Sequence, residues 1–180
     1  MNNTDSKWFK LAQKEDCPII RETASQIWEP TYRELLPPDQ LDFMFNWMYS
    51  VESLENQMEE GHTFFLFYIG DVPMGYVSVV KEKDHENRYH LQKIYLNPSL
   101  QGKGMGRVLL DKAIEYVHEI APEASEIALN VNRYNEKAVN FYRRNGFEVE
   151  FEGDFHIGHG YYMTDYIMVK QIGSNTDIKS

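Results

Sequence analysis

Gln101-Gly102-Lys103-Gly104-Met105-Gly106-Arg107 places three alternating glycines directly before a segment whose apolar residues recur at three- and four-residue steps as far as Ile120. Glycine lets a backbone turn tightly and lets a ligand approach without interference from a Cβ atom. The periodicity predicts an amphipathic helix. A helix start presents N–H groups without intrahelical partners and the positive end of the helix dipole. The stretch therefore favours an anion site, to which Lys103 and Arg107 add charge, or a plain turn before a core helix.

Two well-known phosphate-binding motifs do not match this stretch. The spacing differs from G-x-x-x-x-G-K-[ST], and no acidic residue closes a strand about twenty positions further on, as a dinucleotide motif requires. Upstream, residues 89–96 read as a strand that Asn97-Pro98 stops. The predicted unit is strand, short turn, glycine loop and helix.

Leu91-x-x-Ile94-Tyr95-Leu96, followed by Gln101-Gly102-x-Gly104-x-Gly106, resembles the acetyl-CoA-binding signature of the GCN5-related N-acetyltransferases (GNAT). Residues 135–147 look like the second motif of that family at nearly every position. The resemblance covers nearly the whole chain. It implies an α/β fold in which a mixed sheet is flanked by helices in three layers, and it implies acetyl-CoA as the acyl donor of an N-acetyltransferase.

Composition sets broad limits on function. A chain of 180 residues is long enough for one domain, expected over residues 1–172 with a polar tail at 173–180. A formal charge of −10 argues against nucleic acid as a partner. Cys17 is the single cysteine, so no internal disulfide or multi-cysteine metal site is expected. The longest apolar run, residues 64–69, is too short to cross a bilayer, and a cytoplasmic protein is expected.

Capping and breaking residues predict the order of the other elements. The expected helices follow Asp16, Pro37-Pro38 and Ser50 or Ser53, and a last helix over 136–145 is capped by Asn135 and closed by Gly146. Pro30 is expected to end the first of these helices. The expected strands are residues 8–12, 63–69, 72–80, 126–131, 147–151 and 161–171, and the charged residues 81–88 are expected to form a solvated loop or the tip of a hairpin.

Acetyl transfer to an amine requires a base for the ammonium, whose pKa is about 10.4, and an acid for the leaving thiolate, whose thiol pKa is about 8.5. By the resemblance, Tyr142 lies near the thioester sulfur and is the candidate acid; the alternative is a buried aromatic anchor. His90 matches a glutamate that several family members use as the base. The glutamate of other members is matched by Asn130, which cannot act as a base. The identity of the base therefore remains open. His90 or a water chain could accept the proton, the amine could arrive already neutral, and His90 could be purely structural.

The resemblance also assigns binding residues. The main chain of Ile94, Tyr95 and Leu96 is expected along the pantetheine and Asn135 beside its arm, with the glycine loop around the pyrophosphate. Leu129, Asn130 and Arg144 are secondary candidates. The full set expected to bind the coenzyme is Ile94, Tyr95, Leu96, Gln101, Gly102, Lys103, Gly104, Met105, Gly106, Arg107, Asn130, Asn135, Tyr142 and Arg144.

Residues 27–37 also resemble a helical region that walls the acceptor pocket in many bacterial members of the family. The resemblance implies that aromatic residues of the first helices belong to the acceptor site, with an aromatic core as the alternative; they are Trp28, Tyr32, Trp47 and Tyr49. By the same resemblance, residues 155–162 are expected to overhang this site, as the equivalent hairpin does in related enzymes, which adds His156 to the candidates. No metal site is expected there. The acceptor is expected to be a small cationic amine such as a polyamine. A protein N-terminus, or a binding domain without catalysis, are the alternatives, and a homodimer is possible.

Overall fold

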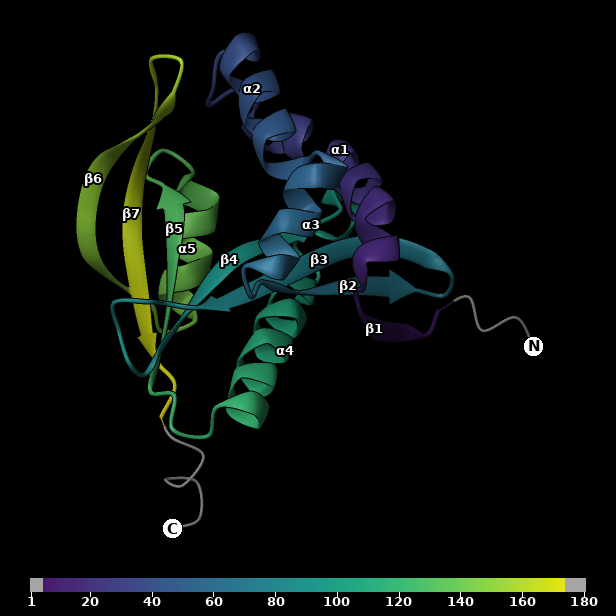
Figure 1. The fold of residues 1–180 in the computed structure, drawn as a ribbon, viewed down its shortest axis with the longest axis vertical. Helices are drawn as coiled ribbons and strands as arrows, with labels where there is room; N and C mark the ends of the chain where they lie inside the picture. The colour runs from purple at the N-terminus through teal and green to yellow at the C-terminus, as the bar shows by residue number, and fades with distance from the viewer. Residues whose placement is uncertain (1–4, 174–180) are drawn as a thin grey trace. The chain divides into compact units, whose positions relative to one another are not determined.

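The protein is described by a computed structural model covering residues 5–173, which form a mixed sheet with flanking helices (Figure 1). The strands hydrogen-bond in the order β1-β2-β3-β4-β5-β7-β6. The predicted α/β class is confirmed. The strands are β1 (Lys7–Leu11), β2 (Thr63–Ile69), β3 (Val72–Lys81), β4 (Arg88–Leu96), β5 (Glu126–Asn132), β6 (Glu148–Gly158) and β7 (Tyr161–Gln171). The α-helices are α1 (Cys17–Tyr32), α2 (Pro38–Tyr49), α3 (Val51–Glu59), α4 (Met105–Ile120) and α5 (Glu136–Arg144), with short 3₁₀ turns η1 (Lys14–Asp16) and η2 (Pro98–Leu100).

The chain packs as two compact units. The first runs to Val80 and includes Lys93–Ala113; the second comprises Lys81–Gln92 and the chain from Ile114 onward. Strand β4 and helix α4 each contribute to both units. One domain over residues 1–172 stays a prediction, and residues 174–180 of the predicted tail lie outside the described part of the chain.

In the first unit, the antiparallel strands β1, β2 and β3 carry helices on both faces. Phe64 and Phe65 are both buried, and because neighbouring side chains of a strand point to opposite faces, they enter different helix layers. Lys112 of α4 lies 5.0 Å from the Phe65 ring centroid. Figure 1 shows α4 on one side of β2 and β3, and α1, α2 and α3 on the other. The strands expected at residues 63–69 and 72–80 are confirmed as β2 and β3, which form a hairpin with its turn at Gly70, whose φ is 59°.

Three local predictions in this unit need correction. Helix α1 does not end at Pro30 but continues to Tyr32, because a proline in the last turn removes one N–H bond while the Arg33 N–H still bonds to the Glu29 carbonyl at 3.0 Å. Asp16 holds the N-cap position of α1 without capping it; its carboxylate accepts from the Gln13 N–H at 2.8 Å instead. Ser50, one of the two proposed residues, caps α3 by accepting from the Ser53 N–H at 3.1 Å.

In the second unit, β4 and β5 run parallel, and β7 lies antiparallel between β5 and β6. Both predictions for α5 are confirmed: the Asn135 side chain accepts from the Ala138 N–H at 3.3 Å, and Gly146 has a φ of 89°. β6 is longer than predicted, so His156 lies in the strand. The apolar stripe of α4 ends before Ile120, which is 48% exposed.

Arg88 was expected in a solvated loop, but it begins β4 and is only 6% exposed. Its guanidinium donates to Glu126 of β5 at 2.8 Å and to both carboxylate oxygens of Glu150 of β6 at 2.8 and 2.9 Å. The hydrogen bonds with Glu150 and Glu126 raise the pKa of Arg88, and the bond to Arg88 lowers the pKa of Glu150. The pKa of Glu126 is lowered first by its hydrogen bond with Gln171 and then by the one with Arg88. A buried arginine is tolerated when carboxylates pair with it, so Arg88 links β4, β5 and β6.

Among residues 5–173, no helix is both long enough and apolar enough to span a membrane.

Candidate functional site

The glycine loop has the backbone of a ligand-binding turn. Asn97 accepts from the Ser99 N–H at 3.0 Å and starts η2, after which Gly102 and Gly104 both adopt a φ of 77°. A Cβ atom at either glycine would meet nothing within 4 Å, so the left-handed backbone, and not crowding, requires glycine there. The predicted loop leading into a helix is confirmed.

The start of α4 suits an anion. This helix is 16 residues long, and its first four N–H groups have no partner within the helix. Lys103 and Arg107 lie at the surface, and the Arg107 side chain is 71% exposed, with Asp111 3.7 Å away. Open space at the glycines, helix N–H groups and two exposed cations fit a diphosphate.

Gly75 of β3 lies against the main chain that was predicted to run along the pantetheine. A Cβ atom there would stand 2.7 Å from the Tyr95 carbonyl oxygen and 3.3 Å from Leu96 Cδ1. The Asn97 N–H also donates to the Met74 carbonyl at 2.8 Å. Gly75 thus allows a close approach of these two segments. The sequence reasoning missed it, although a glycine inside a strand pattern marks such a contact.

Three of the four proposed acceptor aromatics come together in the first unit. Trp28 and Tyr49 are almost fully buried, and the Trp28 Nε1–H donates to the Tyr49 hydroxyl at 2.9 Å. Tyr32 stacks near Trp28, with ring centroids 4.6 Å apart, and its hydroxyl lies 2.9 Å from that of Tyr95. Trp47 does not join them, because it is 50% exposed on α2.

Tyr76, which was not predicted, completes this aromatic cluster. Its hydroxyl lies 2.7 Å from that of Tyr49, and burial raises the pKa of both phenols well above 10.0. Both phenols are therefore neutral at physiological pH. We refer to Trp28, Tyr32, Tyr49, Tyr76 and Tyr95 as the aromatic cluster.

Lys93 is a buried lysine beside this cluster and was also missed. It is 3% exposed, and its Nζ donates to Gln57 Oε1 at 2.6 Å. The Tyr49 and Phe64 ring centroids lie 5.7 and 5.4 Å from Nζ. The rings favour the ammonium form, but burial outweighs them and lowers the pKa of Lys93 to about 7. The sequence does carry a signal for this buried lysine, because Lys93 lies between Leu91 and Tyr95 on what is otherwise an apolar face of the predicted strand.

In the second unit, Tyr142 lies on α5 and is 8% exposed. Its ring packs edge-on against Phe147 at 5.5 Å and Phe141 at 5.3 Å. Asn135 caps the same helix, two turns earlier, while Arg144 is exposed. This packing holds the phenol ring rigidly, and the acid role of Tyr142 stays a prediction.

His90 pairs with a carboxylate that the sequence reasoning had assigned to a solvated loop. His90 Nδ1 lies 2.9 Å from Glu82 Oε1, and His85 Nε2 lies 3.9 Å from Glu82 Oε2. The hydrogen bond to His90 lowers the pKa of Glu82. A carboxylate at one ring nitrogen fixes the orientation of an imidazole, as a general base requires.

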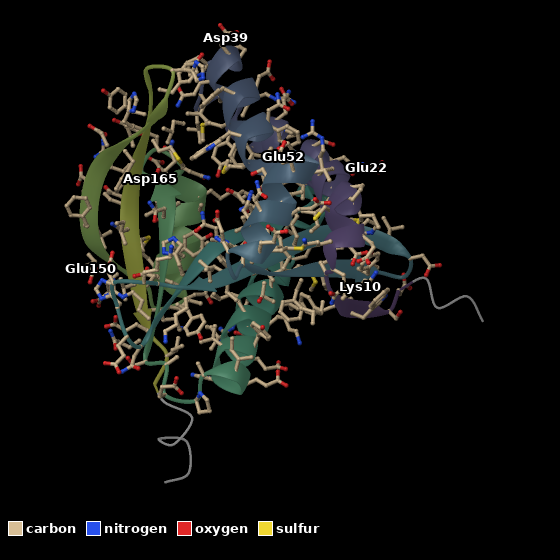
Figure 2. The ribbon with its side chains drawn as sticks, in the orientation of Figure 1. Lys10, Glu22, Asp39, Glu52, Glu150 and Asp165 are labelled. Carbon is tan, nitrogen blue, oxygen red and sulfur yellow. The ribbon has the colours of Figure 1, made fainter. Side chains whose placement is uncertain are left out.

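Asn130, on β5, hydrogen-bonds to a second carboxylate that sequence reasoning missed. Its Nδ2 donates to Asp165 Oδ2 at 3.4 Å, and Asp165, labelled in Figure 2, is 1% exposed. Asp165 Oδ1 has no hydrogen-bond partner among the described residues. Burial raises the pKa of Asp165 to about 6, against the lowering effects of Asn130 and Arg133.

His156 packs edge-on against Tyr162, with ring centroids 5.1 Å apart, and His159 lies in the turn with a φ of 53°. Within residues 5–173, no group of three or more histidine, cysteine, aspartate or glutamate side chains is arranged to hold a metal ion.

Comparisons with known proteins agree with this geometry. The model of the acetyltransferase (GNAT) family matches residues 21–147. The peptidyl-lysine N-acetyltransferase YjaB of Escherichia coli is 38% identical over 60 residues, which are 33% of this chain and 36% of that protein. A probable spermine N(1)-acetyltransferase of Bacillus subtilis subsp. natto is 29% identical over 111 residues, 59% of this chain and 68% of that protein. The match to the Escherichia coli relative thus spans only about a third of its length.

Among solved structures, the PaiA N-acetyltransferase of Thermoplasma acidophilum, in complex with coenzyme A, superposes with a TM-score of 0.75 at 24% identity, over 92% of this chain and 99% of that one. The likeness confirms the predicted fold. The family model covers both the glycine loop and the helix that carries Tyr142. The chain belongs to the acetyltransferase (GNAT) family.

Proposed function

We propose that the protein is an N-acetyltransferase that moves an acetyl group from acetyl-CoA to a primary amine. The observation that carries the proposal is the left-handed backbone at Gly102 and Gly104 directly before the 16-residue helix α4. Helix N-termini bind phosphate groups, and the diphosphate of a coenzyme matches the two exposed cations of this loop. Family membership supports the same donor.

The residues of the second unit supply proton transfer in this proposal. Bound acetyl-CoA brings the acetyl group as a thioester, which an amine can attack directly. Tyr142, held by its aromatic neighbours, donates its hydroxyl proton to the leaving sulfur. The attacking nitrogen must lose a proton, and His90, whose Nδ1 lies 2.9 Å from Glu82 Oε1, is one candidate acceptor.

We further propose a small cationic amine, such as a polyamine, as the acceptor. Tyr32 and Tyr95, the two half-buried members of the aromatic cluster, offer rings that attract ammonium groups, and the chain carries a formal charge of −10. The spermine acetyltransferase relative supports this choice. A peptidyl lysine is the second candidate, favoured by the Escherichia coli relative. Both acceptors carry a primary ammonium on an alkyl chain.

The experiment combines binding and turnover. Calorimetry with acetyl-CoA tests the donor, and thiol release is then measured with spermine, spermidine, amino acids and lysine peptides. We expect micromolar coenzyme binding, and faster turnover of polyamines than of peptides. Preference for a lysine peptide would replace the first acceptor with the second. Coenzyme binding without turnover of any acceptor would favour a non-catalytic binding domain.

Tyr142→Phe tests the acid. It keeps the ring packing and removes only the hydroxyl, so we expect kcat to fall about 100-fold, in line with the usual contribution of a general acid, while coenzyme affinity stays within a factor of two. Tyr134→Phe is the matched control, because Tyr134 is 65% exposed. Equal kcat values for the two variants would remove Tyr142 from the mechanism. A homodimer and a cytoplasmic location remain predictions.

A further inference from the structure

Asp165 lies on the same face of its sheet segment as two other polar residues. In β5, Ala128 pairs with His90 of β4, and Asn132 pairs with Asp165 of β7. Paired residues share a face, as do alternate residues along a strand. His90, Asn130 and Asp165 therefore project from one face of β4, β5 and β7, and Asn130 stands between the other two along β5.

The Asp165 carboxylate is held in a specific orientation. Asn130 occupies Oδ2, while Oδ1 has no partner among residues 5–173, and the side chain is almost completely buried. A buried carboxylate oxygen without a hydrogen-bond donor is costly. A ligand that donates a hydrogen bond to Oδ1 would remove this cost and explain why no protein group does so.

We propose that Asp165 is the general base of the acetyl transfer and that Asn130 is its positioning residue. This inference rests on the proposed function. An amine N–H is the donor that would complete Oδ1. The acceptor releases its ammonium proton to solvent and attacks as the neutral amine, and as the nitrogen–carbon bond forms, a second N–H proton passes to Oδ1 of Asp165. The carbon–sulfur bond breaks, and the sulfur takes the proton of Tyr142. Asp165 then releases its proton to solvent, from which Tyr142 recovers one.

The electrostatic surroundings suit this role. Arg133, which follows β5, favours the carboxylate form, but it is itself paired with Glu152 and Asp154 of β6 at 2.9 and 3.2 Å. Its charge is thereby largely neutralised. On the β4 side, His90 shares the face and is paired with Glu82. Burial raises the pKa of Asp165 to about 6, which makes it a stronger base than an exposed aspartate while leaving it mostly ionised at pH 7 to 8.

The test is the pH profile of kcat at saturating acceptor for Asp165→Asn. We expect kcat to fall about 100-fold or more at pH 7.5, as for other general bases. The acid limb of the profile, which is the decrease of kcat as the pH falls through about 6, should disappear. Asp71→Asn is the matched control, because Asp71 is exposed in the β2–β3 turn and is not one of the charged groups around Asp165. It should keep both the rate and the limb. The exchange Asn130→Asp with Asp165→Asn restores a carboxylate–amide pair and should recover an acid limb.

A structural role predicts a different outcome. If Asp165→Asn lowers kcat equally at every pH and leaves the limb in place, the proposal is overturned, and it is equally overturned if His90→Gln removes the limb while Asp165→Asn does not. Thermal melting at pH 7.5 shows whether the variant folds; the isosteric amide should melt no lower than the wild type.

A readout without turnover completes the test. In the coenzyme-free protein, ¹³C NMR of labelled aspartate should show one side-chain carboxyl titrating near pH 6, absent from Asp165→Asn. A normal titration of every aspartate would contradict the assigned environment. Wild-type protein that acetylates no acceptor would instead refute the proposed function itself, together with this inference.

Discussion

Lys93→Met should remove a pH-dependent destabilisation of the fold. In the folded state, burial lowers the pKa of Lys93 from 10.5 to about 7, while the unfolded chain keeps the ordinary value. Between these values the unfolded state binds the extra proton, so the free energy of unfolding rises as pH rises. The slope is about 1.4 kcal/mol per pH unit, and the whole effect is about 5 kcal/mol. Because Lys93 is 3% exposed, solvent screening removes little of it.

The variant also loses a hydrogen bond. Gln57 Oε1 accepts from Lys93 at 2.6 Å, and leaving it without a donor costs about 1–3 kcal/mol at every pH. The comparison that isolates the charge is therefore the change in stability with pH. From pH 7 to pH 9, the wild type should gain about 2–3 kcal/mol relative to Lys93→Met.

Urea denaturation at several pH values, with linear extrapolation to water, measures this difference. Lys81→Met serves as the matched control, because Lys81 is exposed and its removal should leave the pH dependence of the wild type unchanged. A difference between the wild type and Lys93→Met that stays constant from pH 7 to 9 would show that burial does not control the protonation of Lys93.

Two further predictions concern the other unit and the glycine loop. Arg88→Met should destabilise the fold by about 1–3 kcal/mol, because Glu126 and Glu150 lose hydrogen bonds to a charged partner. It should also reduce the part of the wild-type stability that is lost when these two glutamates, whose pKa values are lowered, become protonated below pH 4.5, although Gln171 continues to lower the pKa of Glu126. Unfolding curves at pH 7 and pH 4 would show this, and an unchanged loss on acidification would contradict it. Gly104→Ala should cost about 1 kcal/mol of stability and weaken acetyl-CoA binding about tenfold by calorimetry, because φ is 77° there. Gly160→Ala is the control, because Gly160 has a φ of 76° in the β6–β7 turn; it should lower stability equally and leave coenzyme affinity unchanged. Equal coenzyme affinities in the two variants would argue against the glycine loop as the binding site.

Short-range signals in the sequence predicted much of the fold. The glycine loop before α4, the Asn135 cap and the left-handed Gly146 all depend on a residue and its neighbours within one or two turns. Pro30 shows the limit of such rules, because its cost depends on how many helical hydrogen bonds follow it. The aromatic cluster was predicted in part, since helical spacing identified Trp28, Tyr32 and Tyr49 but could not show that Trp47 faces outward.

By itself, the sequence determined the family, the order of most elements and the glycine loop, since these follow from local backbone preferences and from a contiguous motif. Only the tertiary structure decided which charges share a site. Asn130 meets Asp165 across 35 positions, and Lys93 meets Gln57 across 36. Neither pair follows from local spacing, because strand register and helix packing bring these residues together. The protonation of Asp165 and Lys93 depends on burial, which arises only when distant segments exclude water from the same side chain.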